Sequence, residues 1–138
     1  MTKTDLNDYT PSDSEEFMNS KQKAYFRQKL ETWKDDILNG AKATISNLRA
    51  ESSNHPDLGD RASSESDKAL ELRTRDRQRK LSSKIDAAIR RIDSGTYGYC
   101  EDTGEPIGVR RLEARPTATL SLEAQERHER KERTVRDD

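Results

Sequence analysis

Apolar residues recur along two long, otherwise polar stretches of the chain at the spacing of a helical stripe. The first stripe consists of Phe26, Leu30, Trp33, Ile37, Ala41, Thr44 or Ile45, and Leu48. The second consists of Leu70, Leu81, Ile85, Ala88 or Ile89, and Ile92. Alternating steps of three and four residues are typical of coiled coils. We therefore expect one helix over about residues 20–53 and a second that begins at residues 61–64 and ends near Asp93.

A turn signal separates the two stripes. Pro56 disfavours a helical conformation at His55, and Gly59 adds backbone freedom three residues later. A short turn forces the two helices that it joins to run antiparallel. The pattern therefore predicts a mainly α fold, built on a long antiparallel coiled-coil hairpin over residues 19–94 with its tip at residues 54–62.

The segments that flank the hairpin have a different character. Residues 1–18 are polar and contain turn formers, so we expect a flexible segment there. Gly, Tyr and Pro gather in residues 96–115, which predicts a compact knuckle of turns or a short hairpin. A last helix is expected from about Thr119 to Arg133. Residues 95–138 would then form a small globular domain that packs with the base of the hairpin.

Composition and charge narrow the possible functions. Only 29% of the residues are apolar and 38% are charged, which suits an extended helical rod better than a large core. With 26 Lys and Arg against 27 Asp and Glu, the chain is not built for general, phosphate-driven binding of nucleic acid. A single Cys excludes an internal disulfide and a Cys-only metal site. No apolar run suits a membrane span or a signal peptide, so we expect the protein in the cytoplasm. We also expect a monomer.

Five cationic side chains crowd into Arg73–Lys80 on the second expected helix. One interpretation is a solvated face whose charges pair with acidic residues across the hairpin. The other is an anion site, because Arg77, Lys80 and Lys84 share one side of a helix and together suit a polyphosphate. Residue types alone leave both interpretations open.

Four segments of the chain carry a recognisable set of motifs: Tyr97–Glu101, Ile107–Thr117, Glu71–Leu81 and the tip pattern Asp57-x-x-Asp60-x-Ala62. Together they resemble the DksA family of bacterial transcription regulators that bind RNA polymerase. The resemblance covers nearly the whole chain after the first residues. It implies a coiled coil that enters the secondary channel of the polymerase, brings its acidic tip near the catalytic centre and destabilises promoter open complexes.

By residue type alone, the tip acids suit structural roles, Asp57 as a turn residue and Asp60 as a helix N-cap. The resemblance assigns them another role, because the family's acting tip residues fall on Asp57, Asp60 and Ala62. A negative tip can engage basic groups of an active site or perturb a bound magnesium ion.

The resemblance also implies a site for the alarmone ppGpp at the polymerase interface. Its residues are Arg77, Lys80, Leu81, Lys84 and Arg115. A further family position, normally a lysine, is Gln125 here. The loss of that cation weakens the expected response to ppGpp without removing the site.

The chain departs from the family at the metal site, where typical members hold zinc with two Cys-x-x-Cys pairs. The corresponding positions here are Cys100, Thr103, Ser121 and Ala124. Neither His55, at the tip, nor His128, one turn beyond Ala124, replaces the lost ligands. We therefore expect no metal and a degenerate zinc-finger-like knuckle without zinc. Its expected core is Tyr97, Tyr99, Ile107, Val109, Leu112, Leu120 and Leu122.

Cys100 itself allows two interpretations. The favoured one is a small buried hydrophobic residue. The other is a redox thiol that reports oxidants, which requires exposure and a lowered pKa.

These observations favour a non-enzymatic regulator of RNA polymerase that acts together with ppGpp. One alternative is a transcript-cleavage factor that uses the same channel and holds magnesium with its tip carboxylates. Another is a structural coiled coil or a degenerate zinc finger that binds nucleic acid. We expect no sequence-specific binding to DNA and no association with membranes, because the net charge is near zero and apolar runs are short.

Overall fold

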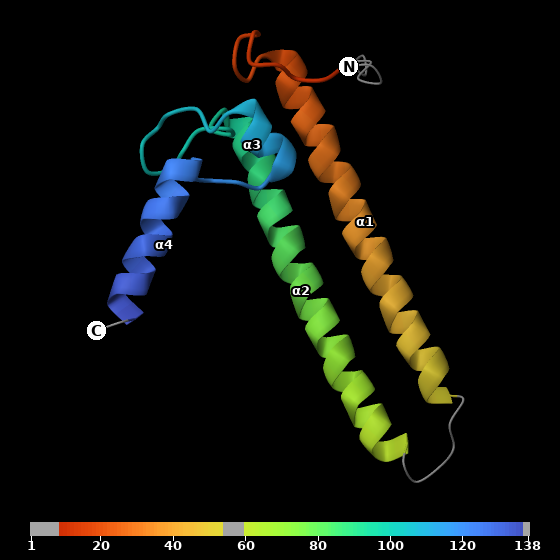
Figure 1. The fold of residues 1–138 in the computed structure, drawn as a ribbon. Coiled ribbons are helices and arrows are strands. Elements are labelled where there is room, and N and C mark those ends of the chain that lie inside the picture. The colour runs from red at the N-terminus through yellow and green to blue at the C-terminus, as the bar shows by residue number, and fades with distance from the viewer. Residues whose placement is uncertain (1–8, 54–59, 137–138) are drawn as a thin grey trace. The chain divides into compact units, whose positions relative to one another are not determined.

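Four helices make up most of the chain in the computed structural model, which describes residues 9–53 and 60–136 (Figure 1). They are α1 (Ser20–Ser53), α2 (Asp60–Ser94), α3 (Val109–Ala114) and α4 (Leu122–Arg136). The mainly α fold class is confirmed, and so are the two long helices. Among these described residues, no helix combines the length and apolarity that a membrane span requires.

The chain divides into two compact units, and the division falls inside α1 and α2. The first unit, which we call the base, comprises Met1–Leu30 and Ala87–Asp138. The second, which we call the shaft, is Glu31–Asp86. The sequence analysis instead places the domain boundary at the end of the hairpin, between residues 94 and 95.

The start of α1 is set by side-chain hydrogen bonds to its first turn. The Asn19 side chain accepts a hydrogen bond from the backbone N–H of Gln22 (2.8 Å), and the Gln22 side chain accepts one from the N–H of Met18 (2.8 Å). Such reciprocal bonds satisfy N–H groups that have no partner within the helix. Asn19 is therefore the N-cap, and the buried Gln22 fixes the direction in which the chain enters α1.

Apolar side chains from all parts of the base form its core. The buried ones are Met18, Phe26, Leu30, Ala88, Ile92, Tyr97, Cys100, Val109, Leu112, Ala118 and Ala124. The rings of Phe26 and Tyr97 lie 5.8 Å apart, and the Tyr97 hydroxyl donates to the carbonyl of Pro116 (2.7 Å). This core confirms Tyr97, Val109 and Leu112 as predicted. Tyr99 and Leu122 were wrongly included, because their side chains are exposed.

The knuckle contains a short antiparallel turn, which the sequence predicted, and the helix α3, which it did not indicate. Tyr99 and Pro106 form an isolated β-bridge, and the N–H of Ile107 donates to the carbonyl of Gly98 (2.7 Å). Gly98 has φ 90°, and a Cβ there would lie 3.1 Å from side-chain atoms of Met18 and Phe17. Only glycine combines this conformation with this close approach. The helix α3 follows directly and buries Val109 and Leu112.

The last helix begins three residues later than expected, at Leu122. Ser121 precedes it, and the Ser121 hydroxyl accepts a hydrogen bond from the N–H of Ala124 (3.2 Å). A serine in this position is a preferred N-cap, which explains the boundary. Ala124 is fully buried, whereas most of the later side chains of α4 are exposed.

The shaft consists of α1 and α2 running antiparallel. Lys34 pairs with Asp86 (2.7 Å) and Arg49 pairs with Glu71 (3.2 Å), so residue numbers rise on one helix as they fall on the other. The apolar stripe of α1 is partly exposed throughout the shaft. Leu70 was wrongly assigned to the stripe of α2, because 43% of it is exposed and the partly buried position is Glu71.

Residues 9–19, most of which fall in the segment expected to be flexible, contact other parts of the base. The ring of Tyr9 lies 5.9 Å from that of Tyr25, and its hydroxyl bonds the Glu15 carboxylate (3.0 Å). Phe17 packs edge-on against Tyr99, with ring centroids 5.5 Å apart. The described part of this segment therefore packs against the knuckle and the start of α1.

Candidate functional site

The acidic tip lies partly outside the described residues. Asp57 and His55 fall in the gap between residues 53 and 60. Asp60 is the first residue of α2, one position earlier than expected, and Ala62 lies in the same helical turn.

The cationic stretch of α2 divides into paired and unpaired side chains. Asp76 holds two of the cations, with Arg79 at 3.2 Å and Lys80 at 3.0 Å. The hydrogen bond from Lys80 is the main cause that lowers the pKa of Asp76. Glu71 likewise accepts a hydrogen bond from Arg75 (2.9 Å), which lowers its pKa. The acids that pair with this stretch therefore include two from α2 itself, whereas the sequence suggested partners across the hairpin.

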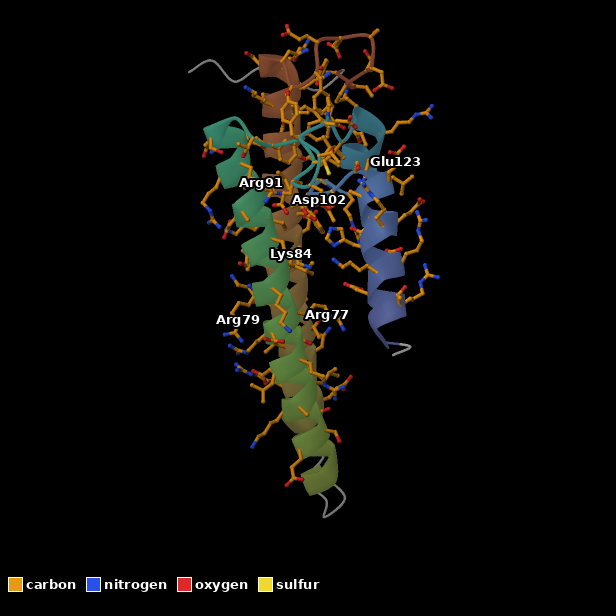
Figure 2. The ribbon with its side chains drawn as sticks, turned by 90° about the vertical axis from the view of Figure 1, so that its left-hand side faces the viewer. Arg77, Arg79, Lys84, Arg91, Asp102 and Glu123 are labelled. Carbon is orange, nitrogen blue, oxygen red and sulfur yellow. The ribbon has the colours of Figure 1, made fainter. Side chains whose placement is uncertain are left out.

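Arg77 and Lys84 are exposed, and the described residues show no ion pair for either. They are seven residues apart, so they lie on the same side of α2, and Arg79 extends from the opposite side of the helix to Arg77 (Figure 2). Lys80 and the partly buried Leu81 lie between them in sequence. Four of the five residues implied for ppGpp thus share one face of one helix in the shaft.

The fifth residue implied for ppGpp, Arg115, belongs to the base. It follows α3 as its C-cap, where its N–H donates to the carbonyl of Arg111 (2.7 Å), and its side chain is exposed. Gln125, which stands where the family has a lysine, donates to Glu129 within α4 (3.2 Å). The joint geometry of Arg115 with the residues of α2 stays a prediction.

Cys100 lies buried in the knuckle, with 3% of its surface exposed. Burial opposes ionisation of this thiol. Backbone hydrogen bonds at Ser121, Thr103 and Asp102, together with the Thr103 side chain, outweigh burial and lower the pKa of Cys100 to about 6. The expected burial of Cys100 is confirmed. Of the two features that a redox thiol requires, the lowered pKa is present and exposure is not. Hydrogen bonding lowers the pKa of a thiol in the same direction as a nearby positive charge would.

The four positions that hold zinc in typical DksA proteins remain near one another but do not fit a zinc ion. Thr103 and Ser121 both bond Cys100, and Ser121 caps the helix that carries Ala124. Tetrahedral zinc needs four nitrogen, oxygen or sulfur ligands, and here one position offers only a methyl group. Within residues 9–53 and 60–136, no three His, Cys, Asp or Glu side chains converge as a metal site. That the protein folds without zinc stays a prediction.

Hydrogen bonds hold the knuckle together around these positions. The N–H of Cys100 donates to the carbonyl of Glu105 (2.8 Å), and the N–H of Glu101 donates to that of Thr119 (2.9 Å). The Arg111 side chain donates to the carbonyl of Leu120 (2.8 Å). These bonds join the same segments that a metal would otherwise connect.

One side-chain hydrogen bond of the knuckle was missed by sequence reasoning. His128 Nε2 on α4 lies 2.7 Å from Asp102 Oδ2, so the pair links α4 to the loop that follows Cys100. The two residues are 26 positions apart, and no sequence spacing indicates that they meet. A second missed feature is Glu71, which contacts both Arg49 on α1 and Arg75 on α2.

Family models match both parts of the chain. Residues 22–92 match "DnaK suppressor protein DksA, N-terminal domain". Residues 95–130 match "Prokaryotic dksA/traR C4-type zinc finger". The second match covers the knuckle, although three of the four zinc-binding cysteines of that family are replaced here.

Individual relatives agree with these matches. The chain is 67% identical over 131 residues to the RNA polymerase-binding transcription factor DksA of Caulobacter vibrioides, covering 95% of this chain and 92% of that protein. It is 44% identical over 115 residues to the protein of the same name from Escherichia coli K12, covering 83% and 76%. The solved structure of transcription factor DksA2 from Pseudomonas aeruginosa matches with a TM-score of 0.77 and 40% identity, covering 89% of this chain and 93% of that one. The chain is a member of the DksA family.

Proposed function

We propose that this protein binds RNA polymerase and regulates transcription. The observation that carries the proposal is the 67% identity, over nearly the full length of both chains, to a relative named as an RNA polymerase-binding transcription factor. The antiparallel arrangement of α1 and α2 supports it, because a paired-helix arm is a form that can enter a narrow channel (Figure 1). In this proposal the protein is a cytoplasmic monomer and is not an enzyme.

The finer mechanism concerns the tip. The hairpin enters the secondary channel, and Asp57 and Asp60 act near the active site to destabilise promoter open complexes. Carboxylates there would attract basic groups of the polymerase or perturb a bound magnesium ion. Ala62 would supply a small side chain beside the two carboxylates.

In vitro transcription from an alarmone-sensitive promoter tests the role of the tip. Asp57→Asn, Asp60→Asn and Ala62→Thr should leave polymerase binding nearly unchanged while abolishing inhibition. Asp36→Asn, an exposed position on α1, is the matched control and should inhibit like the wild type. Normal inhibition by the tip variants would disprove this mechanism.

A stalled elongation complex tests the main alternative. A transcript-cleavage factor would shorten the RNA of a stalled elongation complex in the presence of magnesium. We expect no shortening, because the proposed role is in initiation. A gel shift on free DNA at physiological salt should likewise be blank, since the charges of the chain nearly balance.

The proposed ppGpp site uses Arg77, Lys80, Leu81, Lys84 and Arg115. Support comes from the exposed, unpaired state of Arg77 and Lys84 among the described residues, because cations without partners are available to phosphate oxygens. Lys80 is held by Asp76, so Asp76→Asn should release it and strengthen the effect of ppGpp. Lys84→Ala should weaken that effect, whereas Arg79→Ala, on the opposite side of α2, should not.

The knuckle is proposed to fold without zinc. Metal analysis of protein purified without chelators should find less than one zinc per ten chains, and addition of a chelator should leave the melting temperature unchanged. A stoichiometric metal that chelation removes, with loss of structure, would disprove this. Whether Cys100 also acts as a redox thiol is decided by mass spectrometry after peroxide treatment, which should leave the buried thiol unmodified.

A further inference from the structure

An open groove lies between α1 and α2 in the shaft, and the proposed actions of the tip and of the ppGpp site do not use it. Its cavity measures about 480 Å³. The residues that line it are Leu38, Ala41, Lys42, Ile45, Ser46, Arg49, Arg75 and Gln78. All of them belong to the shaft. A cavity of this volume is large enough to accept several side chains of a partner.

The groove exists because the two helices contribute unequal side chains to their seam. Helix α1 supplies Leu38 and Ile45, which are seven residues apart and therefore lie on one face. Helix α2 supplies Arg75 and Gln78 to the lining, neither of which is apolar. Leu38 and Ile45 consequently remain partly exposed. A heptad-spaced apolar row that stays partly uncovered is a surface that a helix can offer to a further helix.

The rim of the groove is cationic. Lys42, Arg49 and Arg75 line it and are all exposed. Glu71 contacts both arginines, at 3.2 Å and 2.9 Å, and so offsets one of the three charges. Among the described residues that line the groove, none is acidic. The groove therefore combines an apolar floor with a positive edge.

We propose that this groove docks an acidic amphipathic helix of RNA polymerase. The apolar side of that helix would cover Leu38 and Ile45, and its carboxylates would face the three cations of the rim. That the partner is RNA polymerase rests on the proposed function. The groove indicates which surface of this protein makes the contact and which residue types the partner presents to it. Charge complementarity disfavours a second copy of this chain, because two-fold pairing through the groove would bring like charges together.

The test measures the affinity of the full-length protein for immobilised core RNA polymerase. Ile45→Asp places a negative charge on the apolar floor and should weaken binding by about tenfold or more. Ala43→Asp makes the same change at an exposed position of α1 outside the groove and should stay within about twofold. Circular dichroism must show the same helical content for both variants.

A second pair of variants keeps the test valid if Ile45→Asp unfolds. Lys42→Glu reverses an exposed charge of the rim and should weaken binding about three- to tenfold, most strongly at low salt. Lys68→Glu, exposed on α2 and outside the groove, is its control. A photo-crosslinking residue at Ser46 should react with an acidic helical segment of the polymerase.

The outcomes separate this inference from the proposed function. If the wild type binds polymerase and the groove variants bind equally well, the groove is not a docking site and the proposed function stands. If the wild type does not bind, the proposed function and this inference both fail. If sedimentation shows a dimer that Ile45→Asp dissociates, the occupant is a second copy. A crosslink to a basic or non-helical segment would also overturn the assignment.

Discussion

The base and the shaft use the same two helices in different ways. In the base, Phe26 and Leu30 of α1 are fully buried, in the same unit as Ala88 and Ile92 of α2. In the shaft, Ile45 continues the stripe of α1 and Leu38 lies beside it, and both stay partly exposed next to polar side chains of α2. Burial of apolar area is the main source of stability, so stability should concentrate in the base and fall along the shaft.

The comparison shows how one heptad pattern can serve two purposes. A buried seam fixes the knuckle and the start of α1 as one core. A partly open seam, crossed by ion pairs such as Lys34–Asp86, leaves apolar and charged surface available to a partner. Exposed ion pairs contribute little to the free energy of unfolding, about 0 to 1 kcal/mol each. The ion pairs of the shaft are therefore not the main source of its stability.

The largest expected effect is on the core of the base. Phe26→Ala removes a fully buried ring that contacts Tyr97 and should lower the free energy of unfolding by about 3 to 5 kcal/mol. Urea denaturation measures it. The control Leu72→Ala removes a side chain of the shaft that is 68% exposed and should change stability by less than about 0.5 kcal/mol. Equal losses would remove the contrast between the two units.

A second test concerns two glycines, one in each unit. Gly98→Ala meets Met18 and Phe17 at 3.1 Å and strains a positive φ, so it should destabilise the protein by about 1 to 3 kcal/mol. Gly40→Ala, in α1 of the shaft with open space around it, should stabilise by about 0.5 to 1 kcal/mol. Thermal unfolding of the two variants should shift in opposite directions.

The thiol of Cys100 makes the stability of the base depend on pH. Its pKa in the folded protein is lowered to about 6, so the folded state holds the thiolate at pH values where the unfolded chain still binds the proton. Stability from this group should therefore rise between about pH 6 and pH 9 and be lost as the pH falls through 6. Thiolate absorbance near 240 nm should follow this titration. Thr103→Val should raise its midpoint, and an unchanged midpoint would contradict the assigned hydrogen bond.

The polar half of the shaft seam can be tested by making it apolar. Gln78→Leu adds an apolar side chain that faces the groove, and should stabilise the shaft by about 1 kcal/mol. Hydrogen exchange of amides in residues 31–51 and 65–86 should slow, while amides of the base change little. Unchanged exchange in the shaft would mean that its seam is not limited by missing apolar contacts.

The smallest expected effect concerns the ion pairs of the shaft. Asp86→Asn breaks the pair with Lys34 and should cost about 0.2 to 1 kcal/mol at low salt and less at high salt. Urea denaturation at two salt concentrations measures it. Asp35→Asn, an exposed position on α1, is the control. A cost above that of Gly98→Ala would mean that charge, rather than apolar burial, holds the shaft together.

Much of the candidate site could be predicted from residue order, and some of it could not. The cations at 77, 80 and 84 share a face because helical spacing is a local property. The partner of Lys80 is also local, four residues away at Asp76, but the sequence offered more distant acids and the choice between them needed coordinates. The pair of His128 with Asp102 depends on how α4 meets the knuckle, which no local rule specifies.

The sequence by itself determined the two long helices and the poor fit of the knuckle to zinc. These follow from spacing, backbone preference and ligand chemistry, all of which act within a few residues or on residue identity alone. Only the tertiary structure decided that α3 forms, that residues 9–19 pack against the knuckle and the start of α1, that hydrogen bonds surround Cys100, and that the seam opens into a groove. Each of these depends on contacts between segments far apart in the chain, and heptad spacing specifies which face is apolar but not how completely another element covers it.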